Sequence, residues 1–130
     1  MQPLILNEEQ SLLRDSAVDF VAQRSPVARM RALRDAGEAI GFDPVVWKEM
    51  ADLGWPGILI PEAYGGLGLG YAEMVVVLEE LGCALAPEPF LGTVLLGANT
   101  LLLGGSEAQK QEVLPAVASG ERFLALAHHE

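Results

Sequence analysis

The sequence predicts an all-α fold, a compact bundle of about six helices. Helix start signals recur along the chain, each an Asn, Asp or Ser just before a helical segment. Apolar residues then repeat at helical spacing, and Gly or Pro follows where that spacing ends. A chain of 130 residues is long enough to form one closed core of this kind.

The first two helices have clear start signals. Asn7 is followed three residues later by Gln10, the pattern of an N-cap with a capping-box partner. The Ser25-Pro26 pair starts a second helix with proline at its first position, and Gly37 ends it. The buried stripe of the first helix is expected to consist of Leu13, Ala17, Phe20 and Val21.

Asp43 and Pro44 start a third helix, which Gly54 ends. Its inward-facing residues are expected to be Val46, Trp47, Met50 and Leu53. Residues 71–85 form a fourth helix, and Pro87 and Pro89 prevent it from continuing. Its apolar side is expected to consist of Met74, Val77, Leu78, Leu81 and Leu85, with Glu73, Glu79 and Glu80 on the other side.

Residues 92–103 are apolar nearly all round, which predicts a central helix buried on every face. Such a helix is either core or the wall of a pocket; core is the default, although Gly92 and Gly97 would leave a groove beside it. Ser106 caps a last helix that Gly120 ends. Its inward-facing residues are expected to be Val113, Leu114 and Val117.

The chain changes character after Gly120. Residues 123–127 form a short apolar run that is equally compatible with a strand. We therefore expect a helical domain in residues 1–122 and the start of a truncated β-domain in residues 123–130.

A loop with four glycines, at residues 65–70, joins the apolar residues 58–60 to the fourth helix. Strand, glycine-rich loop and helix is also the layout of a dinucleotide-binding turn. Here residues 61–64 intervene, the spacing is G-G-x-G-x-G, and no second strand with its acidic residue follows. A sharp connector is therefore favoured over a phosphate cradle.

The formal charge of −10 argues against a nucleic-acid partner. The one basic concentration is Arg24, Arg29, Arg31 and Arg34, which is expected to be a solvated face. The hydrophobic fraction of 51% suggests surface that is buried against further domains or subunits. The longest apolar run, residues 90–103, is too short for a membrane span, and no signal-like N-terminus precedes it, so we expect a cytoplasmic protein.

The residues alone identify no catalytic side chain. Cys83 is the single cysteine and is expected to be a buried structural thiol. His128 and His129 are adjacent, so their side chains diverge and no metal site is expected. Neighbouring carboxylates, such as Glu79 with Glu80 and Glu8 with Glu9, are expected to lie on helix surfaces in contact with solvent. By this reasoning the chain is a helical scaffold without an active site.

Four motifs follow one another in the chain: W-P-G-I-L-I at residues 55–60, P-E-A-Y-G-G-L-G-L-G at 61–70, V-L-E-E-L-G at 77–82 and S-E-A-Q-K-Q-E-V-L-P-A-V-A-S-G-E at 106–121. Together they resemble the N-terminal helical domain of acyl-CoA dehydrogenases, from about residue 7 to residue 130. In that family a middle β-domain and a C-terminal helical bundle follow, and FAD lies between the domains.

The resemblance implies α,β-dehydrogenation of an acyl-CoA thioester with FAD as the cofactor. It also implies an electron-transferring flavoprotein as acceptor and a homo-oligomeric enzyme. The family's catalytic base lies in the C-terminal bundle, so no catalytic residue is assigned here, and this chain alone is expected to be colourless and inactive.

Two sets of site residues carry over by position. The flavin-contacting strand of the family matches Leu126, His128 and His129, where His129 replaces the family's threonine. The acyl-pocket segment matches Glu88, Pro89, Gly92, Thr93 and Leu96. Gly92 and Thr93 are small, which would leave depth for an acyl or ring-like tail.

Two other functions fit the same residues. The chain could be a stand-alone helical interaction module that has lost catalysis, or part of a flavin-dependent oxidase or monooxygenase on the same scaffold. A downstream β-domain and a carboxylate-bearing bundle would distinguish an enzyme from the module.

Overall fold

The computed structural model describes residues 5–37 and 39–128, and over these residues it contains helices and turns but no strand. The α-helices are α1 (Glu8–Arg24), α2 (Val27–Ala36), α3 (Pro44–Asp52), α4 (Tyr71–Cys83), α5 (Asn99–Gly104) and α6 (Glu107–Ala118). Two short 3₁₀ helices, η1 (Trp55–Gly57) and η2 (Glu62–Tyr64), flank residues 58–61, and a π-helix, η3 (Leu91–Ala98), precedes α5. The predicted all-α bundle of about six helices is confirmed.

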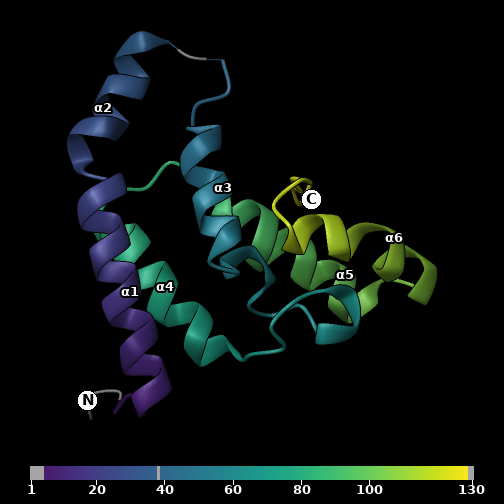
Figure 1. The fold of residues 1–130 in the computed structure, drawn as a ribbon. Helices are drawn as coiled ribbons and strands as arrows, with labels where there is room; N and C mark the ends of the chain where they lie inside the picture. The colour runs from purple at the N-terminus through teal and green to yellow at the C-terminus, as the bar shows by residue number, and fades with distance from the viewer. Residues whose placement is uncertain (1–4, 38, 129–130) are drawn as a thin grey trace.

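Helices α1 and α4 lie side by side along one edge of the molecule, and α2 extends beyond the end of α1 (Figure 1). No residue of α2 is buried. The opposite end of the molecule is formed by α5 and α6. Of the helices in the described residues, none has the length and hydrophobicity needed to cross a membrane.

The N-termini of α1 and α4 are tied to each other by hydrogen bonds. The predicted capping box is present, because the Gln10 N–H donates to Asn7 Oδ1 (2.8 Å) and the Asn7 N–H donates to Gln10 Oε1 (3.1 Å). Gln10 Nε2 then donates to Glu73 Oε1 (2.8 Å), and the Gly70 N–H donates to Glu73 Oε2 (2.9 Å). One carboxylate thereby joins two helix starts that are 63 residues apart.

These contacts predict a pH dependence of stability that a Glu73→Gln variant should reveal. The hydrogen bond from Gln10, followed by those from the backbone N–H groups of Glu73 and Gly70, holds the pKa of the Glu73 carboxyl below its ordinary value. A depressed pKa in the folded protein stabilises it above the unfolded-state value of about 4.3, and this contribution is lost as the pH falls through the lower folded pKa.

Between pH 7 and pH 3 we therefore expect the wild type to lose more free energy of unfolding than Glu73→Gln does, as measured by urea denaturation. Glu79→Gln, which changes an exposed carboxylate of the same helix, should instead lose as much as the wild type. Equal losses for the wild type and Glu73→Gln would contradict the prediction.

The core consists of two hydrophobic clusters. The larger one packs α1, α3 and α4 around η1, and its buried residues are Ala17, Val46, Trp47, Met50, Trp55, Ile58, Met74, Val77, Leu81, Phe90 and Val94. The smaller one joins α6 to the end of η3, and its buried residues are Ile60, Ala98, Leu114, Val117 and Ala118. Residues 55–70 therefore lie between the two clusters, and they contribute side chains to both.

The glycine-rich loop folds back on the residues that precede it. The N–H groups of Leu67, Gly68 and Leu69 donate to the carbonyls of Gly57, Ile60 and Ile58, each at 2.8 Å. The N–H groups of Gly65 and Gly66 donate to the carbonyls of Glu62 and Pro61, and that of Gly70 donates to the Glu73 carboxylate. A phosphate cradle needs free backbone N–H groups, and these are occupied. The interpretation as a connector is confirmed.

Three predictions at helix ends are wrong. Leu53, the C-cap of α3, is 45% exposed, and Leu85, beyond the end of α4, is 55% exposed with a φ of +52°. Cys83, the last residue of α4, is exposed and is therefore not a buried thiol. The reason is the same in each case, since helical periodicity stops setting the direction of side chains where the helix itself ends.

Candidate functional site

The two segments that carry the predicted site residues are joined at one point, between Thr93 and Leu124. Thr93 of η3 is fully buried, and its hydroxyl contacts the backbone of Leu124, 31 residues further along the chain. The Leu124 N–H donates to Thr93 Oγ1 (3.2 Å), and Thr93 Oγ1 donates to the Leu124 carbonyl (3.3 Å). The segment predicted to contact a flavin is thereby fixed to the helix predicted to line an acyl pocket.

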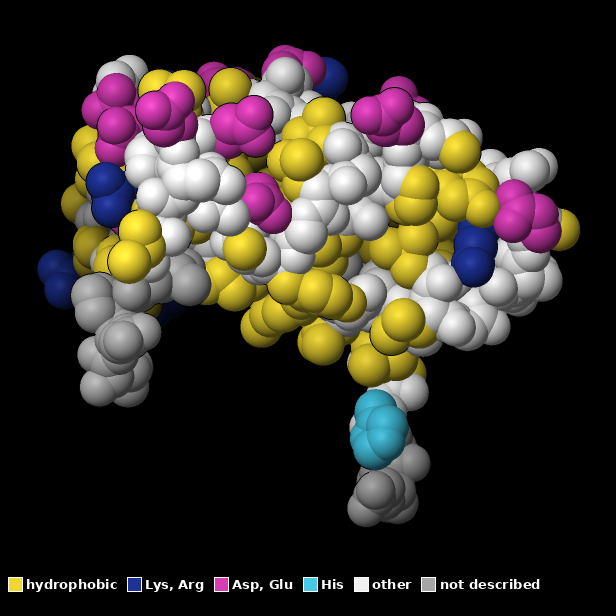
Figure 2. All heavy atoms as spheres, turned by 90° about the horizontal axis from the view of Figure 1, so that it is seen from below, with side chains coloured by type: hydrophobic (Ala, Val, Ile, Leu, Met, Phe, Trp, Pro, Cys, Tyr) yellow, Lys and Arg dark blue, Asp and Glu magenta, His cyan; other side chains and the backbone are white. Residues whose placement is uncertain are grey.

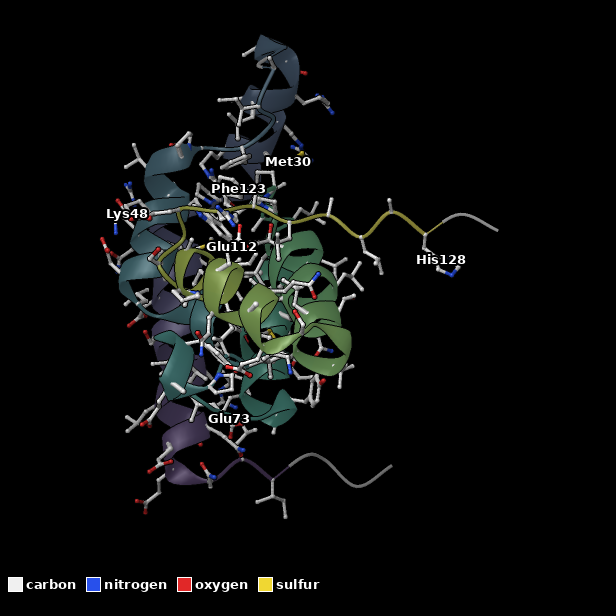
Figure 3. The ribbon with its side chains drawn as sticks, turned by 90° about the vertical axis from the view of Figure 1, so that its right-hand side faces the viewer. Met30, Lys48, Glu73, Glu112, Phe123 and His128 are labelled. Carbon is white, nitrogen blue, oxygen red and sulfur yellow. The ribbon has the colours of Figure 1, made fainter. Side chains whose placement is uncertain are left out.

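Aromatic contacts hold the start of this C-terminal segment. Trp47 Nε1 donates to the Gly120 carbonyl (2.8 Å). The Phe123 ring lies 5.2 Å from the Trp47 ring and 5.3 Å from the Phe42 ring, measured between centroids. From Phe123 the segment runs outward and carries His128 away from the body of the molecule (Figure 3). Residues 121–128 adopt neither helix nor strand, so a domain boundary at residue 123 stays a prediction.

The helix that carries the predicted acyl-pocket residues differs from the expectation. Residues 92–103 fall in η3 and α5 and are not buried on every face, because Leu96 and Leu103 are 42% and 80% exposed. Hydrogen bonds between residues five apart define a π-helix and place such residues above one another, so Leu91 and Leu96 share an exposed face. A uniformly apolar sequence does not reveal this exposed side. π-helices are rare and occur frequently at functional sites.

The groove that Gly92 and Gly97 were expected to leave is occupied by Leu124. A Cβ atom on Gly97 would lie 2.4 Å from the Leu124 Cβ, and one on Gly92 would lie 3.8 Å from the Leu124 carbonyl oxygen. Leu124 of the C-terminal segment thus packs into a site formed by Gly92, Thr93 and Gly97. Sequence reasoning identified the small residues but not the leucine that fills the space between them.

Glu88 forms a buried ion pair with Arg29. Its carboxylate accepts hydrogen bonds from Arg29 Nη1 (2.8 Å) and Nη2 (2.9 Å), and its side chain is fully buried. Arg29 Nη2 also donates to the buried Ser25 hydroxyl (3.0 Å). The expectation that Arg29 belongs to a solvated face is wrong, because its guanidinium is the partner of a buried acid.

Pro89 is half-buried, and its carbonyl accepts the Thr93 N–H (3.0 Å). The side chains of this region border two separate hollows. One, of about 280 Å³, is lined in part by Glu88, Phe90 and Leu91; the other, of about 310 Å³, is lined in part by Gly97, Leu124 and Leu126. Of the acyl-pocket residues, Glu88 lines the first of these hollows and none lines the second.

Large hydrophobic side chains remain exposed around this site, among them Leu85, Leu91, Leu96 and Leu126. Figure 2 shows hydrophobic surface gathered along the lower side of the view. His128 is exposed, and His129 lies outside the described residues. Over residues 5–37 and 39–128, no group of three His, Cys, Asp or Glu side chains is arranged to hold a metal ion.

Comparison with known proteins identifies the family of this chain. The sequence model of the family described as acyl-CoA dehydrogenase, N-terminal domain, matches residues 7–121. The chain belongs to the acyl-CoA dehydrogenase family. The resemblance inferred from its motifs is confirmed.

Acyl-CoA dehydrogenase IpdE2 of Mycolicibacterium smegmatis is 37% identical over 103 residues, which are 78% of this chain and 32% of that protein. Among solved structures, the ChsE4-ChsE5 complex from Mycobacterium tuberculosis contains a chain that matches with a TM-score of 0.83 and 30% identity, covering 95% of this chain and 34% of that one. An acyl-CoA dehydrogenase from Bacillus anthracis, complexed with FAD, matches with a TM-score of 0.79 and 26% identity over 95% of this chain and 21% of that one.

This member of the acyl-CoA dehydrogenase family therefore spans about a third or less of the length of those relatives. It corresponds to their helical N-terminal domain.

Proposed function

We propose that this chain serves as the N-terminal domain of an FAD-dependent acyl-CoA dehydrogenase, with the acyl group and the flavin meeting along η3. The observation that carries the proposal is the attachment of Leu124 to Thr93, because it fixes the start of the predicted flavin-contacting segment to the helix that carries the predicted acyl-pocket residues. Two segments 31 residues apart in sequence are thereby joined, and a shared reaction site requires that the acyl group and the flavin be held close together.

The residues after Leu124 suit one edge of a flavin site. The side chains of Leu126 and His128 are exposed, and the hollow of about 310 Å³ beside Leu126 is lined mainly by apolar residues. The backbone N–H groups of residues 125–128 make no hydrogen bond to other described residues, so they can donate to polar atoms of a ring. Leu126, His128 and His129 would therefore hold the flavin. FAD, when bound, supplies the acceptor for the hydrogen removed from Cβ of the acyl group.

Some of the predicted acyl-pocket residues could contact the acyl group directly, and others could act on it only indirectly. Leu96 is exposed and Gly92 is half-exposed, so these two positions can touch a substrate directly. Thr93 and Glu88 are buried. Thr93 would act through the Leu124 backbone that it holds, and Glu88 through its ion pair with Arg29, with Pro89 between them in sequence. Because the Arg29 guanidinium pairs with the Glu88 carboxylate, no unpaired charge faces the acyl chain from this position.

The remaining parts of the reaction are proposed to lie in the rest of the polypeptide. The base that removes the α-proton, most of the FAD site and the contact with an electron-transferring flavoprotein belong there. The exposed leucines along η3 would be covered by those further domains or by other subunits of a homo-oligomer. A cytoplasmic location accompanies this proposal.

The proposal is tested by a Gly92→Phe variant of the whole polypeptide that carries this domain, after its size in source cells has been determined by immunoblot. The wild type should bind FAD and reduce a dye with acyl-CoA. A phenylalanine at Gly92, a half-exposed position, should lower kcat/KM for long acyl groups about ten-fold or more, with little change for short ones, since it would project into the space proposed for the far end of a long acyl group.

Gly104→Phe is the matched control, because Gly104 is exposed and nothing lies within 4 Å of its Cβ position. It should leave both rates unchanged. A native protein of 13.9 kDa without FAD would favour the stand-alone module, and reduction of oxygen in place of the dye would favour an oxidase. Unchanged activity of Gly92→Phe toward long acyl groups would overturn the assignment of the pocket wall.

A further inference from the structure

The hydroxyl of Thr93 has an unusual arrangement for a side chain inside a helix. A threonine hydroxyl in a helix commonly bonds to a carbonyl of its own preceding turn, as that of Thr100 does with the Leu96 carbonyl at 2.8 Å. The Thr93 hydroxyl instead serves both the N–H and the carbonyl of Leu124. The hydroxyl of this fully buried residue therefore satisfies both hydrogen-bonding groups of the Leu124 backbone, its N–H and its carbonyl.

This contact is also the last attachment of the C-terminal segment to the helices. The Arg122 N–H donates to the Ala116 carbonyl (2.9 Å), and Leu124 is bonded to Thr93. Within residues 5–37 and 39–128, no hydrogen bond holds the segment beyond that point. The direction in which His128 leaves the body of the molecule (Figure 3) is therefore set at Leu124.

Packing on η3 supports the same contact. Gly97 has no side chain where Leu124 lies, and a Cβ there would overlap with the leucine. The Thr93 N–H is itself bonded to the Pro89 carbonyl, so the hydroxyl is carried by a fixed turn of helix. Leu124 is thus positioned by its packing against Gly92, Thr93 and Gly97. The two hydrogen bonds to Thr93 fix the orientation of its peptide groups.

We propose that Thr93 is a positioning residue for the flavin, acting through the Leu124 backbone to aim Leu126 and His128. The inference rests on the proposed function, since it needs a flavin to be bound by residues 126–129. It assigns to Thr93 a role different from a pocket wall, because the side chain is buried and reaches the cofactor only through the C-terminal segment.

The test compares Thr93→Val with Thr93→Ser in the whole polypeptide. Valine keeps the shape of threonine and removes the hydroxyl, which leaves the Leu124 N–H and carbonyl without their partner. Serine keeps the hydroxyl and removes the buried methyl group. We expect Thr93→Val to weaken FAD binding at least about five-fold and to change the visible spectrum of the bound flavin. Thr93→Ser should bind FAD within about two-fold of the wild type.

Thermal unfolding is measured on the same variants, because a role in packing alone predicts a different result: the serine variant, and not the valine variant, would be the less stable protein. If Thr93 only fills space, Thr93→Ser is the more damaged protein and both variants bind FAD as the wild type does. Ser119→Ala, which removes an exposed hydroxyl bonded to its own helix at the Ala116 carbonyl, is the control and should bind FAD normally.

Equal FAD affinity of Thr93→Val and the wild type, or equal loss in the valine and serine variants, would overturn the role of Thr93. A wild-type polypeptide that binds no FAD would instead overturn the proposed function itself, so the two failures are distinguishable.

Discussion

Replacing Arg29 with methionine is expected to lower the free energy of unfolding by about 3–5 kcal/mol. The Glu88 side chain has no exposed surface, and Arg29 supplies both of the charged donors that its oxygens accept. Without them the carboxylate stays buried and unpaired, or it must take up a proton or move to water. Since small domains are stable by about 5–15 kcal/mol, the loss should be plain in urea denaturation.

The chain provides a matched control for this variant. Arg24 makes the same two-pronged contact with Glu49, at 2.6 and 2.7 Å, but these side chains are 43% and 37% exposed. Arg24→Met should therefore lower the free energy of unfolding much less than Arg29→Met does, because solvent screens the exposed pair. The double variant Arg29→Met, Glu88→Leu should recover most of the loss, because an apolar pair has no charge to desolvate. Equal losses at Arg24 and Arg29 would show that burial does not govern the Arg29 pair.

Gly66→Ala is the second change with a large expected effect, about 3 kcal/mol or more. A Cβ on Gly66 would lie 2.0 Å from the Ile60 carbonyl oxygen and 2.5 Å from the Ile60 Cβ. These atoms belong to or adjoin the backbone and cannot rotate away, so the loop must open. The same Ile60 carbonyl accepts the Gly68 N–H, and Ile60 is fully buried in the smaller core cluster.

Gly82→Ala is the contrasting substitution, since Gly82 lies inside α4 and nothing is within 4 Å of its Cβ position. It should stabilise the protein by about 0.5–1 kcal/mol, as alanine does relative to glycine in a helix. Both variants are compared by thermal and urea unfolding. A Gly66→Ala protein as stable as the wild type would mean that the loop can rearrange without loss, contrary to its close packing against Ile60.

The features predicted correctly from the sequence are those whose partners are close along the chain. The caps at Asn7, Asp43 and Ser106 bond to backbone two or three residues away, so the pattern of residue types is sufficient. Residues in the middle of helices, such as Ala17, Met50 and Leu114, face inward as helical spacing predicts. These local rules predict the fold class and most of the core.

The features that were missed depend on partners far along the chain. The Arg29–Glu88 pair spans 59 residues and the Thr93–Leu124 contact spans 31, and nothing in either local sequence identifies the other member. The exposed side of η3 was missed for a different reason. A uniformly apolar segment has no polar face to mark which residues point outward, so Leu96 and Val94 look alike in sequence although only Val94 is buried.

The hydrogen bonds of the glycine-rich loop also bear on the order in which the chain folds. Those donated by Leu67, Gly68 and Leu69 close segments of only eight to eleven residues, whereas the contact of Gln10 with Glu73 closes a segment of 63. The entropy lost on closing a segment grows with its length, so topology favours closure of the loop before α1 and α4 meet. Trp55 and Ile58 would then form an apolar surface on which those two helices dock.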